Sequence, residues 1–542
     1  MDLQSFFENF EVIAEAPGGV QKLRSLILDL AVRGKLVPQD AKDEPAEVLH
    51  IIEHGEVYEL PEHWQFVELG QVIQFVNGFA FKSADFQTHG LGVVRIGNLV
   101  NGAIDPTSMN CVQPDYLSKL DAKFQVHPGD LLIAMSGATT GKLAFNTTNN
   151  IYLLNQRVGK IIPIKIHPEY LYYFLNTQIK KNLEASFGSA IPNLSTQYIN
   201  SIPTPLPPFA EQKRIVAKVD ELMALCDRYE AAKQTRDNLR QKLRGSAIDA
   251  LMNADSDETL GDAWAIVQEN WLDLSQEPQD VDDLRKLILE LAVRGKLVPQ
   301  DASDGNASDF QESSKKTKQQ LTASGQIKKS KPLGKIPHEL IVHEIPKSWQ
   351  WSWLDDISDI GTGSTPLTSN PDYYEGGNIP WITSTSTSQD FIAQAENFVT
   401  DLAVKDHRLR MYQPGCLIVA LYGQGKTRGQ ISGLKIAATI NQACAAITLL
   451  DATHEHQEYI RYVFKKKYEE LRSLAAGGAQ PNLNVGKIKE TLIPLPPLPE
   501  QKRIVTKVEQ LTTLCDTLED HLRDAQAKAK ALAAAAVSQL VI

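Results

Sequence analysis

The sequence lacks the features that mark membrane, secreted and disulfide-rich proteins. It has no apolar run of roughly 18 residues, so no membrane-spanning helix is expected. Its N-terminus is acidic and has neither the basic start nor the apolar core of a signal peptide. Five cysteines occur in 542 residues and none forms a CxxC pair, which predicts neither a disulfide framework nor a zinc site. These absences together fit a protein of the reducing cytoplasm.

The motifs of four catalytic classes are also missing or incomplete. An amino-methyltransferase needs Asn or Asp before its Pro-Pro-aromatic run to hold the target amino group, but Leu206 and Leu495 stand there. A phosphate-binding loop needs a glycine where Ala420 stands. A nuclease site could use Asp115 and Asp121, but these acidic residues have no counterpart in the second half. The histidines do not have the spacing of metal ligands. We therefore expect no catalytic residue and no bound metal in this chain.

Charge limits how the protein could bind nucleic acid. Lys and Arg number 55 against 66 Asp and Glu, a formal net charge of −11. That balance argues against a protein that coats nucleic acid by charge alone. It leaves open a sequence reader whose basic residues are local, or whose partners supply positive charge.

What the sequence does contain is a long internal repeat. Residues 205–230 and 494–519 are identical at 17 of 26 positions, at an offset of 289. Each copy opens with prolines, which suit a helix entrance, and continues with a 4-3-4-3 apolar seam of coiled-coil type. The first helix is predicted from about residue 211 to 252, and the two helices are predicted to pack seam on seam. The seams are Ile215, Val219, Leu222, Cys226 and Tyr229, and Ile504, Val508, Leu511, Cys515, Leu518 and Leu522.

A second repeated stretch lies upstream of the first in each half, and we call it the arm. Residues 23–41 and 284–302 match at 17 of 19 positions, at an offset of 261, and are typical of a short helix ended by Gly and Pro. Between this arm and the long helix, each half mixes strand-like and helical runs, which predicts an α/β globule. The globules match weakly, at offsets from 285 to 289. The second half also carries an insertion at 303–335, which is polar and lysine-rich and is predicted to be a flexible linker.

The predicted fold class is α/β: two mixed α/β globules joined by two long antiparallel coiled-coil helices, with a pseudo-two-fold internal repeat. The expected segments are an N-terminal helical arm at 1–56, a first globule at 57–204, a central region at 205–302 with the long helix and a second arm at 284–302, the linker at 303–335, a second globule at 336–493, and a distal helix at 494–542.

Four stretches together carry a resemblance to a known family. They are PLPP followed by EQKRIV, the tryptophan-containing entry to each globule, GFAFKSADF at 78–86, and the LAVRGKLVPQ arm. With them the chain resembles the specificity subunit of type I restriction–modification systems, in the subgroup that begins with such an arm. The resemblance covers almost the whole chain. It implies two target-recognition domains that each read one half of a bipartite double-stranded DNA site, and helices that set their spacing and dock methyltransferase subunits.

The same resemblance places the chemistry on other chains. It implies a non-catalytic subunit that directs adenine methylation or DNA cleavage by two methyltransferase subunits and by helicase-nuclease restriction subunits. S-adenosylmethionine, ATP and Mg would be bound by those partners, and no cofactor by this chain. The residues also leave open a second hypothesis, a paired-globule scaffold that binds peptides or proteins through its long helices without DNA.

Candidate DNA contacts lie on loops that follow buried strands, because base edges are read by polar side chains held on rigid loops. The alternative interpretation is that the glycines turn hairpins and that Asn and Gln satisfy backbone groups. In the first globule the candidates are Lys82, Arg95, Asn98, Ser136, Thr139, Thr140, Lys142, Asn155, Gln156 and Arg157. In the second, where loop 422–428 is aligned on 136–142, they are Thr362, Ser364, Thr365, Thr383, Tyr422, Gln424, Lys426, Thr427, Arg428, Asn441 and Gln442.

Repeated polar residues off the two seams are candidates for partner docking. Their duplication suits two copies of one partner, whereas a solvated helix face is the alternative interpretation. They are Gln212, Lys213, Arg214, Gln501, Lys502 and Arg503.

Overall fold

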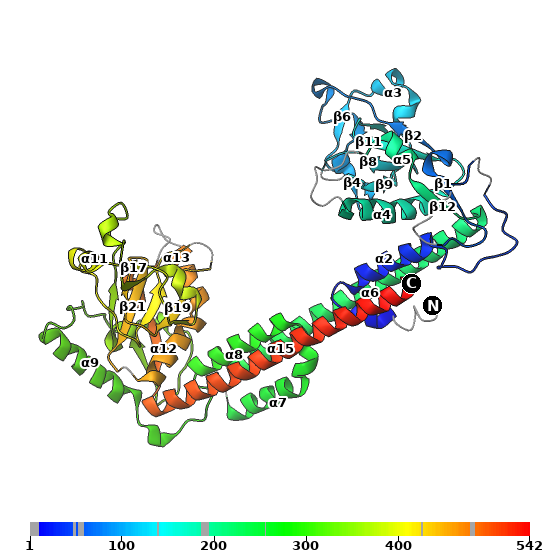
Figure 1. Cartoon of the computed structure of the whole chain (residues 1–542). Coiled ribbons are helices and arrows are strands. Elements are labelled where there is room, and N and C mark those ends of the chain that lie inside the picture. The colour runs from blue at the N-terminus through cyan, green and yellow to red at the C-terminus, as the bar shows by residue number, and fades with distance from the viewer. Residues whose placement is uncertain are drawn as a thin grey trace. The chain divides into compact units, whose positions relative to one another are not determined.

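The computed structural model forms two compact units, residues 1–238 with 525–542, and residues 239–524. Their helices and strands are labelled in Figure 1. The structure describes residues 10–46, 50–52, 59–137, 140–185, 194–254, 256–423, 426–451, 453–476 and 483–541.

Two long helices each contribute residues to both units. Helix α6 (Phe209–Asn253) begins in the first unit and ends in the second, whereas α15 (Leu498–Val541) begins in the second and ends in the first. The observed bounds of α6 lie close to the predicted 211–252. No helix in the described ranges has the length and apolar character needed to cross a membrane.

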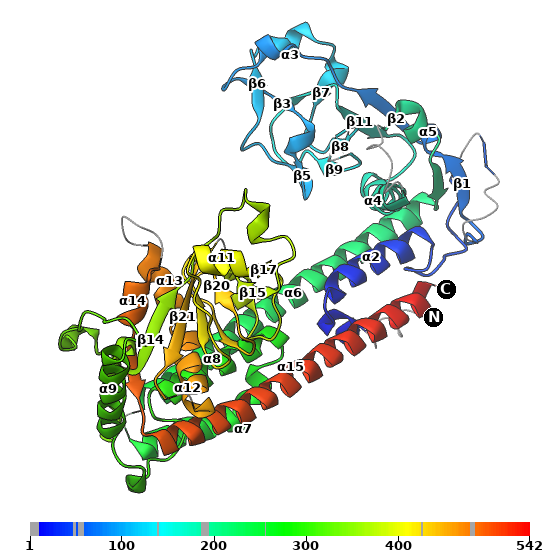
Figure 2. The ribbon, with the colours of Figure 1, turned by 60° about the vertical axis from the view of Figure 1, so that its left-hand side comes forward.

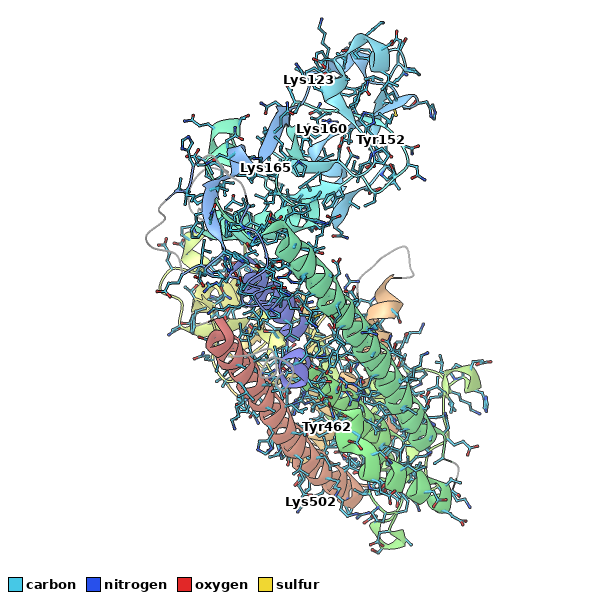
Figure 3. The ribbon with its side chains drawn as sticks, turned by 90° about the vertical axis from the view of Figure 1, so that its right-hand side faces the viewer. Lys123, Tyr152, Lys160, Lys165, Tyr462 and Lys502 are labelled. Carbon is cyan, nitrogen blue, oxygen red and sulfur yellow. The ribbon has the colours of Figure 1, made fainter. Side chains whose placement is uncertain are left out.

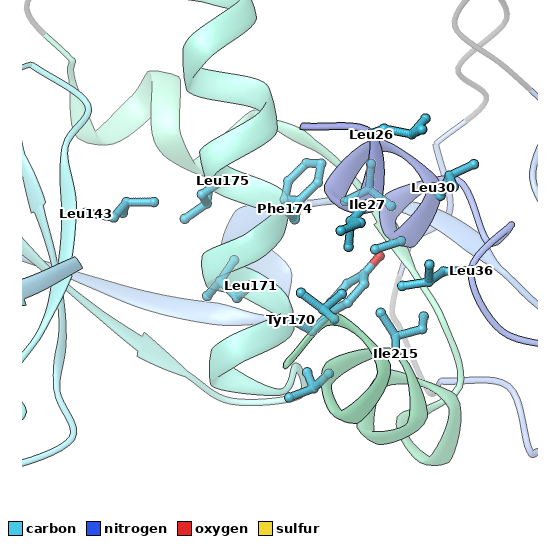
Figure 4. Close-up of a cluster of buried hydrophobic side chains, with 14 of the residues drawn as sticks. Leu26, Ile27, Leu30, Leu36, Leu143, Tyr170, Leu171, Phe174, Leu175 and Ile215 are labelled. Atoms are coloured by element: carbon cyan, nitrogen blue, oxygen red, sulfur yellow. The ribbon is translucent and has the colours of Figure 1, made fainter. Parts of the chain in front are cut away.

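In the first unit, the arm covers the seam of α6. Helix α2 (Gly19–Val32) buries Leu23 and Ile27 in one cluster with Ile215 and Leu222 of α6, and Ala533 near the end of α15 joins them. Figure 4 shows Ile27 and Ile215 converging in this cluster, next to helix α4 (Pro168–Ala185). The long helices therefore meet here through alanines of α15 and not through its seam.

In the second unit, the seam of α15 is covered in the same way. Helix α8 (Val281–Val293) places Val281 and Ile288 in one cluster with Val508 and Cys515 of α15. The prediction that the two seams pack on each other is therefore wrong. Each seam is buried by the arm helix of its own half, because the repeated structural unit includes the arm.

A repeated ion-pair cluster holds each arm to its long helix. Arg24 Nη2 of α2 lies 2.7 Å from Asp227 Oδ1 and 2.9 Å from Glu230 Oε2 of α6. Since both contacts recur at equivalent positions, arm and helix are joined by the same side chains in both units. The second copy consists of Arg285, Asp516 and Glu519, with both distances 2.7 Å.

The described residues of the first globule form three sheets. Their strand orders are β2-β11-β8-β9-β5-β4, β6-β3-β10-β7 and β1-β12. Strand β8 coincides with the strand-like run of the sequence at 131–134, and β3 overlaps the run at 93–96. The bounds are β1 Gln65–Glu68, β2 Ile73–Asn77, β3 Leu91–Val94, β4 Leu99–Val100, β5 Gly102–Ile104, β6 Asn110–Val112, β7 Gln125–Val126, β8 Leu131–Ala134, β9 Leu143–Phe145, β10 Tyr152–Leu154, β11 Val158–Pro163, α5 Thr196–Asn200 and β12 Pro203–Leu206.

The second globule repeats this plan with fewer strands. Its sheets have the orders β14-β21-β18-β19-β16, β17-β15-β20 and β13-β22. The mixed α/β prediction is thus confirmed for both globules. The bounds are β13 Gln350–Trp353, α10 Leu354–Ile357, β14 Ser358–Thr362, β15 Ile379–Ile382, β16 Phe391–Ile392, β17 Phe398–Val399, α11 Asp401–Asp406, β18 Leu417–Ala420, β19 Ile431–Leu434, β20 Thr439–Ile440, β21 Cys444–Leu449, α12 His454–Lys466, α13 Tyr468–Ala476, α14 Val485–Lys489 and β22 Leu492–Leu495.

Residues 303–335 are not the flexible linker that their composition predicts. They include helix α9 (Ala307–Ala323), which buries Ala307 and Ser314 and lies beside β14 (Figure 2). The ring of Phe310 packs 5.0 Å from that of His456, and Lys318 forms a 2.9 Å ion pair with Asp355. Small residues and one aromatic ring are enough to dock this helix. The low apolar content of residues 303–335 therefore led to the wrong prediction of a flexible linker.

Helix α7 (Asp257–Leu274) was not predicted. Its Ala263 and Val267 pack with Leu251 of α6 and with Leu287 and Leu291 of α8. A signal for it is present in the sequence: residues 269–271 read ENW and residues 8–10 read ENF, at the offset of the arms.

Candidate nucleic-acid interface

Strand register brings four segments of the first globule to one edge. Ala134, the last residue of β8, pairs with Val158, the first residue of β11. Val94, at the end of β3, pairs with Leu154, at the end of β10. The turns beyond these residues therefore lie side by side, and the end of β2 joins them, because Asn77 pairs with Gly159. We call residues 77–82, 95–98, 135–137, 140–142 and 155–157 the first edge.

A close backbone approach holds the segment after β2 against this edge. A Cβ on Gly78 would lie 2.0 Å from the carbonyl oxygen of Asn155, so no other residue type fits there without a shift of the backbone. The Phe79 amide then donates to Leu154 O at 2.8 Å. In the second globule, a Cβ on Gly363 would lie 1.6 Å from Ile440 O, so the same requirement recurs.

Five candidates present exposed side chains at the first edge, and three of them carry the cationic groups nearest the strand ends. Arg95 follows β3, with its guanidinium 5.7 Å from the ring centre of Phe86, and Lys142 precedes β9. Arg157 occupies the turn between β10 and β11, where its carbonyl accepts from the Met135 amide at 2.9 Å. Ser136 is half-buried, and Thr139 lies outside the described residues. The exposed candidates are Lys82, Arg95, Lys142, Gln156 and Arg157.

Three other candidates of the first globule are corrected, because their side chains are buried and serve the backbone. Asn98 Oδ1 accepts from the Arg95 amide at 2.9 Å, and its Nδ2 donates to Asp105 O at 3.1 Å. Thr140 Oγ1 donates to Gly137 O at 2.6 Å, and Asn155 Oδ1 accepts from the Arg157 amide at 3.3 Å. These residues shape the loops, as the alternative interpretation proposed.

The second globule forms an equivalent edge. Ala420, at the end of β18, pairs with Cys444, at the start of β21, and Ile382 at the end of β15 pairs with Ile440. Thr362 at the end of β14 pairs with Ala445. We call residues 362–365, 383–388, 421–423, 426–430 and 441–443 the second edge.

The candidates of the second edge are mostly uncharged. Thr362 and Gln442 are exposed, but Thr362 Oγ1 donates to Cys444 O at 2.8 Å, and Gln442 accepts a hydrogen bond from Thr365. Asn441 Oδ1 accepts from the Ala443 amide at 3.0 Å, as Asn155 does in the first edge. Tyr422 and Lys426 are exposed, Ser364, Thr383, Thr427 and Arg428 are half-buried, and Gln424 lies outside the described residues.

A hollow of about 340 Å³ opens at the second edge. It is bounded by residues 387–390, which follow β15, by the β18–β19 loop and by α12 and α13. Asp390 binds Lys465 there at 2.7 Å, and Tyr468 donates to the carbonyl of Lys426. Polar groups from three separate elements therefore meet in one concave surface.

Backbone hydrogen bonds correct the alignment of the two edges. The Ala134 amide donates to Lys142 O at 2.9 Å, and the Ala420 amide donates to Gln430 O at 3.0 Å. Gln430 is therefore the structural counterpart of Lys142, in place of Arg428, because the second loop is two residues longer. Gln430 was absent from the candidates, since an ungapped alignment passes over it.

The docking candidates are corrected in part. Gln212 and Gln501 are fully buried, and their amides bind inside the fold. Gln212 Oε1 accepts from the His167 amide at 2.7 Å, and Gln501 Oε1 lies 2.8 Å from His456 Nδ1. Arg214 and Arg503 are half-buried in ion pairs with Asp43 and Asp304. Lys213 and Lys502 are exposed, the latter on the first turns of α15 (Figure 3).

A buried carboxyl group fixes each globule to its long helix and was missed by sequence reasoning. Glu211 of α6 accepts from Trp64 Nε1 at 3.0 Å and from Gln39 Nε2 at 2.6 Å, and burial raises the pKa of its carboxyl. Glu500 accepts likewise from Trp349 Nε1 at 2.8 Å and from Gln300. All these residues recur in both halves, and this recurrence was the signal by which the sequence could have revealed them.

Within the described residues no group of three or more His, Cys, Asp or Glu could hold a metal ion.

Comparison with known proteins agrees with this duplicated architecture. The family model for the type I restriction modification DNA specificity domain matches residues 61–236 and again 346–525. The specificity subunit of the type I restriction enzyme EcoAI from Escherichia coli is 27% identical, over 94% of this chain and 91% of that protein. The EcoEI specificity subunit from Escherichia coli is 26% identical, with the same coverage of both chains.

A solved structure shares the fold. The chain comes from work on complex assembly and conformational transition of the type I R-M system; its TM-score is 0.50 and its sequence identity 19%, over 90% of this chain and 99% of that chain. The two family matches each span nearly all of one globule and the whole repeated part of the long helix that follows it. The chain therefore belongs to the type I restriction–modification specificity subunits, with one DNA specificity domain in each half.

Proposed function

We propose that the first and second edges each read one half of a bipartite site in double-stranded DNA. The chain is a specificity subunit, and the observation that carries the assignment is the convergence of polar and basic side chains at the ends of four strands in each globule. Strand ends are rigid, and rigidly held Arg, Lys, Gln and Thr side chains are the groups that read base edges. The buried strands and turn residues behind them keep these side chains in place.

The different composition of the two edges supports reading of two different sequences. The arms are nearly identical in both halves and the first part of each long helix is identical at 17 of 26 positions, whereas the edges share few side chains. A scaffold that bound two copies of one protein through the globules would need similar surfaces in both. Two different edges on a repeated framework are what two distinct half-sites require.

Partner chains supply the catalysis. Two methyltransferase subunits dock on surfaces repeated in the two halves, where Lys213 and Lys502 are exposed at the start of the long helices. Restriction subunits join the same complex, and S-adenosylmethionine, ATP and Mg are bound by these partners. The net charge of −11 fits such an assembly, because partners that enclose the duplex would supply phosphate contacts that this chain lacks. The complex acts in the cytoplasm, where it meets chromosomal DNA.

A globule exchange tests this function. The chain is produced with its methyltransferase, and methylated sites are mapped by sequencing. Replacing the first globule with that of another specificity subunit should change one half of the methylated site and leave the other half and the site's bipartite form intact. A replacement that altered both half-sites would contradict independent reading, and a wild-type complex that methylated no defined site would contradict the function itself.

A further inference from the structure

The two edges differ in charge at structurally equivalent positions. Lys142 and Gln430 are equivalent because the backbone carbonyl of each accepts a hydrogen bond from the amide of the last residue of the preceding strand, β8 or β18. The carbonyls of Arg157 and Ala443 accept from the Met135 and Leu421 amides in the same way, at 2.9 and 2.7 Å. Two cationic positions of the first edge are thus uncharged in the second.

This difference indicates what the position of Lys142 and Gln430 contacts. The phosphate backbone is the same in every half-site, and its neutralisation needs Lys or Arg. A position that neutralised a phosphate would therefore carry a cation in both halves, whereas a glutamine amide can only donate a hydrogen bond to a phosphate oxygen. Because it carries a cation in one half and an amide in the other, the position fits contact with the bases, which differ between half-sites.

The side-chain oxygen of Gln430 is buried and, among the described residues, unpaired, so the side chain would turn toward the hollow to make such a contact. The side chain is half-buried and lines the hollow of the second edge with Ser388 and Lys426. Its Oε1 accepts no hydrogen bond within the part of the chain that the structure describes. The backbone of the same residue is fixed on both sides, since its amide donates to Thr427 O at 3.1 Å and its carbonyl accepts from Ala420. A buried acceptor on a fixed backbone is an incomplete hydrogen-bonding site, which a ligand donor would complete.

We propose that Gln430 is a specificity-determining residue that reads an adenine in the second half-site, and that Lys142 reads a guanine at the equivalent place of the first. A glutamine amide both donates and accepts, which matches N7 and the N6 amino group of adenine in the major groove. A lysine only donates, which matches the O6 and N7 acceptors of guanine. This inference rests on the proposed function and adds to it the base chemistry of each half-site.

Reciprocal substitutions test the proposal in the complex with the methyltransferase. The variants Gln430→Lys and Lys142→Gln are compared with wild type by sequencing the sites that each methylates in a random duplex library. Gln430→Lys should change the preferred base from adenine to guanine at one position of the second half-site, by roughly ten- to hundredfold. Lys142→Gln should make the opposite change at one position of the first half-site. Lys316→Gln, an exposed change on α9 away from the edges, should leave the methylated site unchanged.

Two further results decide the case. Gln430→Ala should weaken the preference for adenine at one position of the second half-site without creating a preference for another base. It therefore tests the contact even if the lysine variant does not fold. Loss of methylation at every sequence alike on Lys142→Gln, with a smaller salt dependence, would show a phosphate contact and overturn the proposal. Unchanged specificity of a folded Gln430→Ala would overturn it as well. These outcomes differ from failure of the proposed function, in which the wild-type complex itself selects no bipartite site.

Discussion

Trp64 and Glu211 are joined by a hydrogen bond of 3.0 Å between the indole Nε1 and a carboxylate oxygen. Trp64 stands at the entry of the first globule, and Glu211 lies in the first turn of α6, so this bond ties the globule to the helix. Trp349 and Glu500 form the same bond at 2.8 Å in the second unit. Both tryptophans and both glutamates are buried. The bond between them therefore fixes the globule, and with it the edge, to the start of the long helix.

Removal of the indole donor should destabilise the unit that contains it. Trp64→Phe keeps an aromatic ring but leaves the buried Glu211 with one donor fewer, so the free energy of unfolding should fall by about 1–3 kcal/mol. Urea denaturation of the purified chain measures it. Trp264→Phe is the matched control, because Trp264 is 36% exposed and should tolerate the change. Equal unfolding curves for the two variants would contradict the anchoring role.

Acid should weaken the first unit through Glu15. Hydrogen bonding to Arg236 lowers the pKa of Glu15 from 4.5 to about 2. A carboxyl group whose pKa is lower in the folded state stabilises the fold above the unfolded pKa, and this stabilisation is lost as pH falls from about 4.5 to about 2. Arg236→Gln should therefore lose less stability over that range than wild type, as followed by urea denaturation at successive pH values. Arg228→Gln, an exposed change on the same helix, should keep the wild-type pH dependence.

Basic residues of the edges should contribute to DNA affinity. Alanine at Lys142, Arg157, Lys426 or Arg428 should weaken binding by the methyltransferase complex, by ~1–3 kcal/mol where the contact is to a base. Competition between target and non-target duplexes at several salt concentrations separates base from phosphate contacts, because a lost phosphate contact reduces the salt slope by about 0.9. Wild-type affinity of all four variants would place the DNA elsewhere on the molecule.

The isolated chain should transfer no methyl group. Leu206 and Leu495 occupy the places where an amino-methyltransferase holds its target amino group, and leucine accepts no hydrogen bond. Purified chain with labelled S-adenosylmethionine and DNA should give no labelled product, whereas addition of the methyltransferase subunit should give one. Label incorporated by the chain alone would refute the assignment of catalysis to a partner.

Much of the architecture could be predicted because the chain contains an internal repeat, so its two halves can be compared with each other. Identity at a constant offset revealed the arms, and the 4-3 spacing of apolar residues located α6 and α15. Gly34 marked the end of α2 correctly: its φ is +70°, and the following Lys35 amide closes the helix on Leu30 O at 3.0 Å. Alternation of strand-like and helical runs was enough to predict mixed α/β globules.

Local periodicity and repeated residues were thus enough to predict the duplication, the long helices, the fold class of the globules and the loops on which the two edges are built. Only the tertiary structure decided what those residues touch. The tertiary structure buried Asn98, Thr140, Asn155, Gln212 and Gln501, covered each seam with an arm helix, folded residues 307–323 against the second globule, and made Gln430 the structural counterpart of Lys142. The physical reason is that burial and hydrogen-bond partners are set by segments far apart in the chain, whose pairing no local pattern encodes.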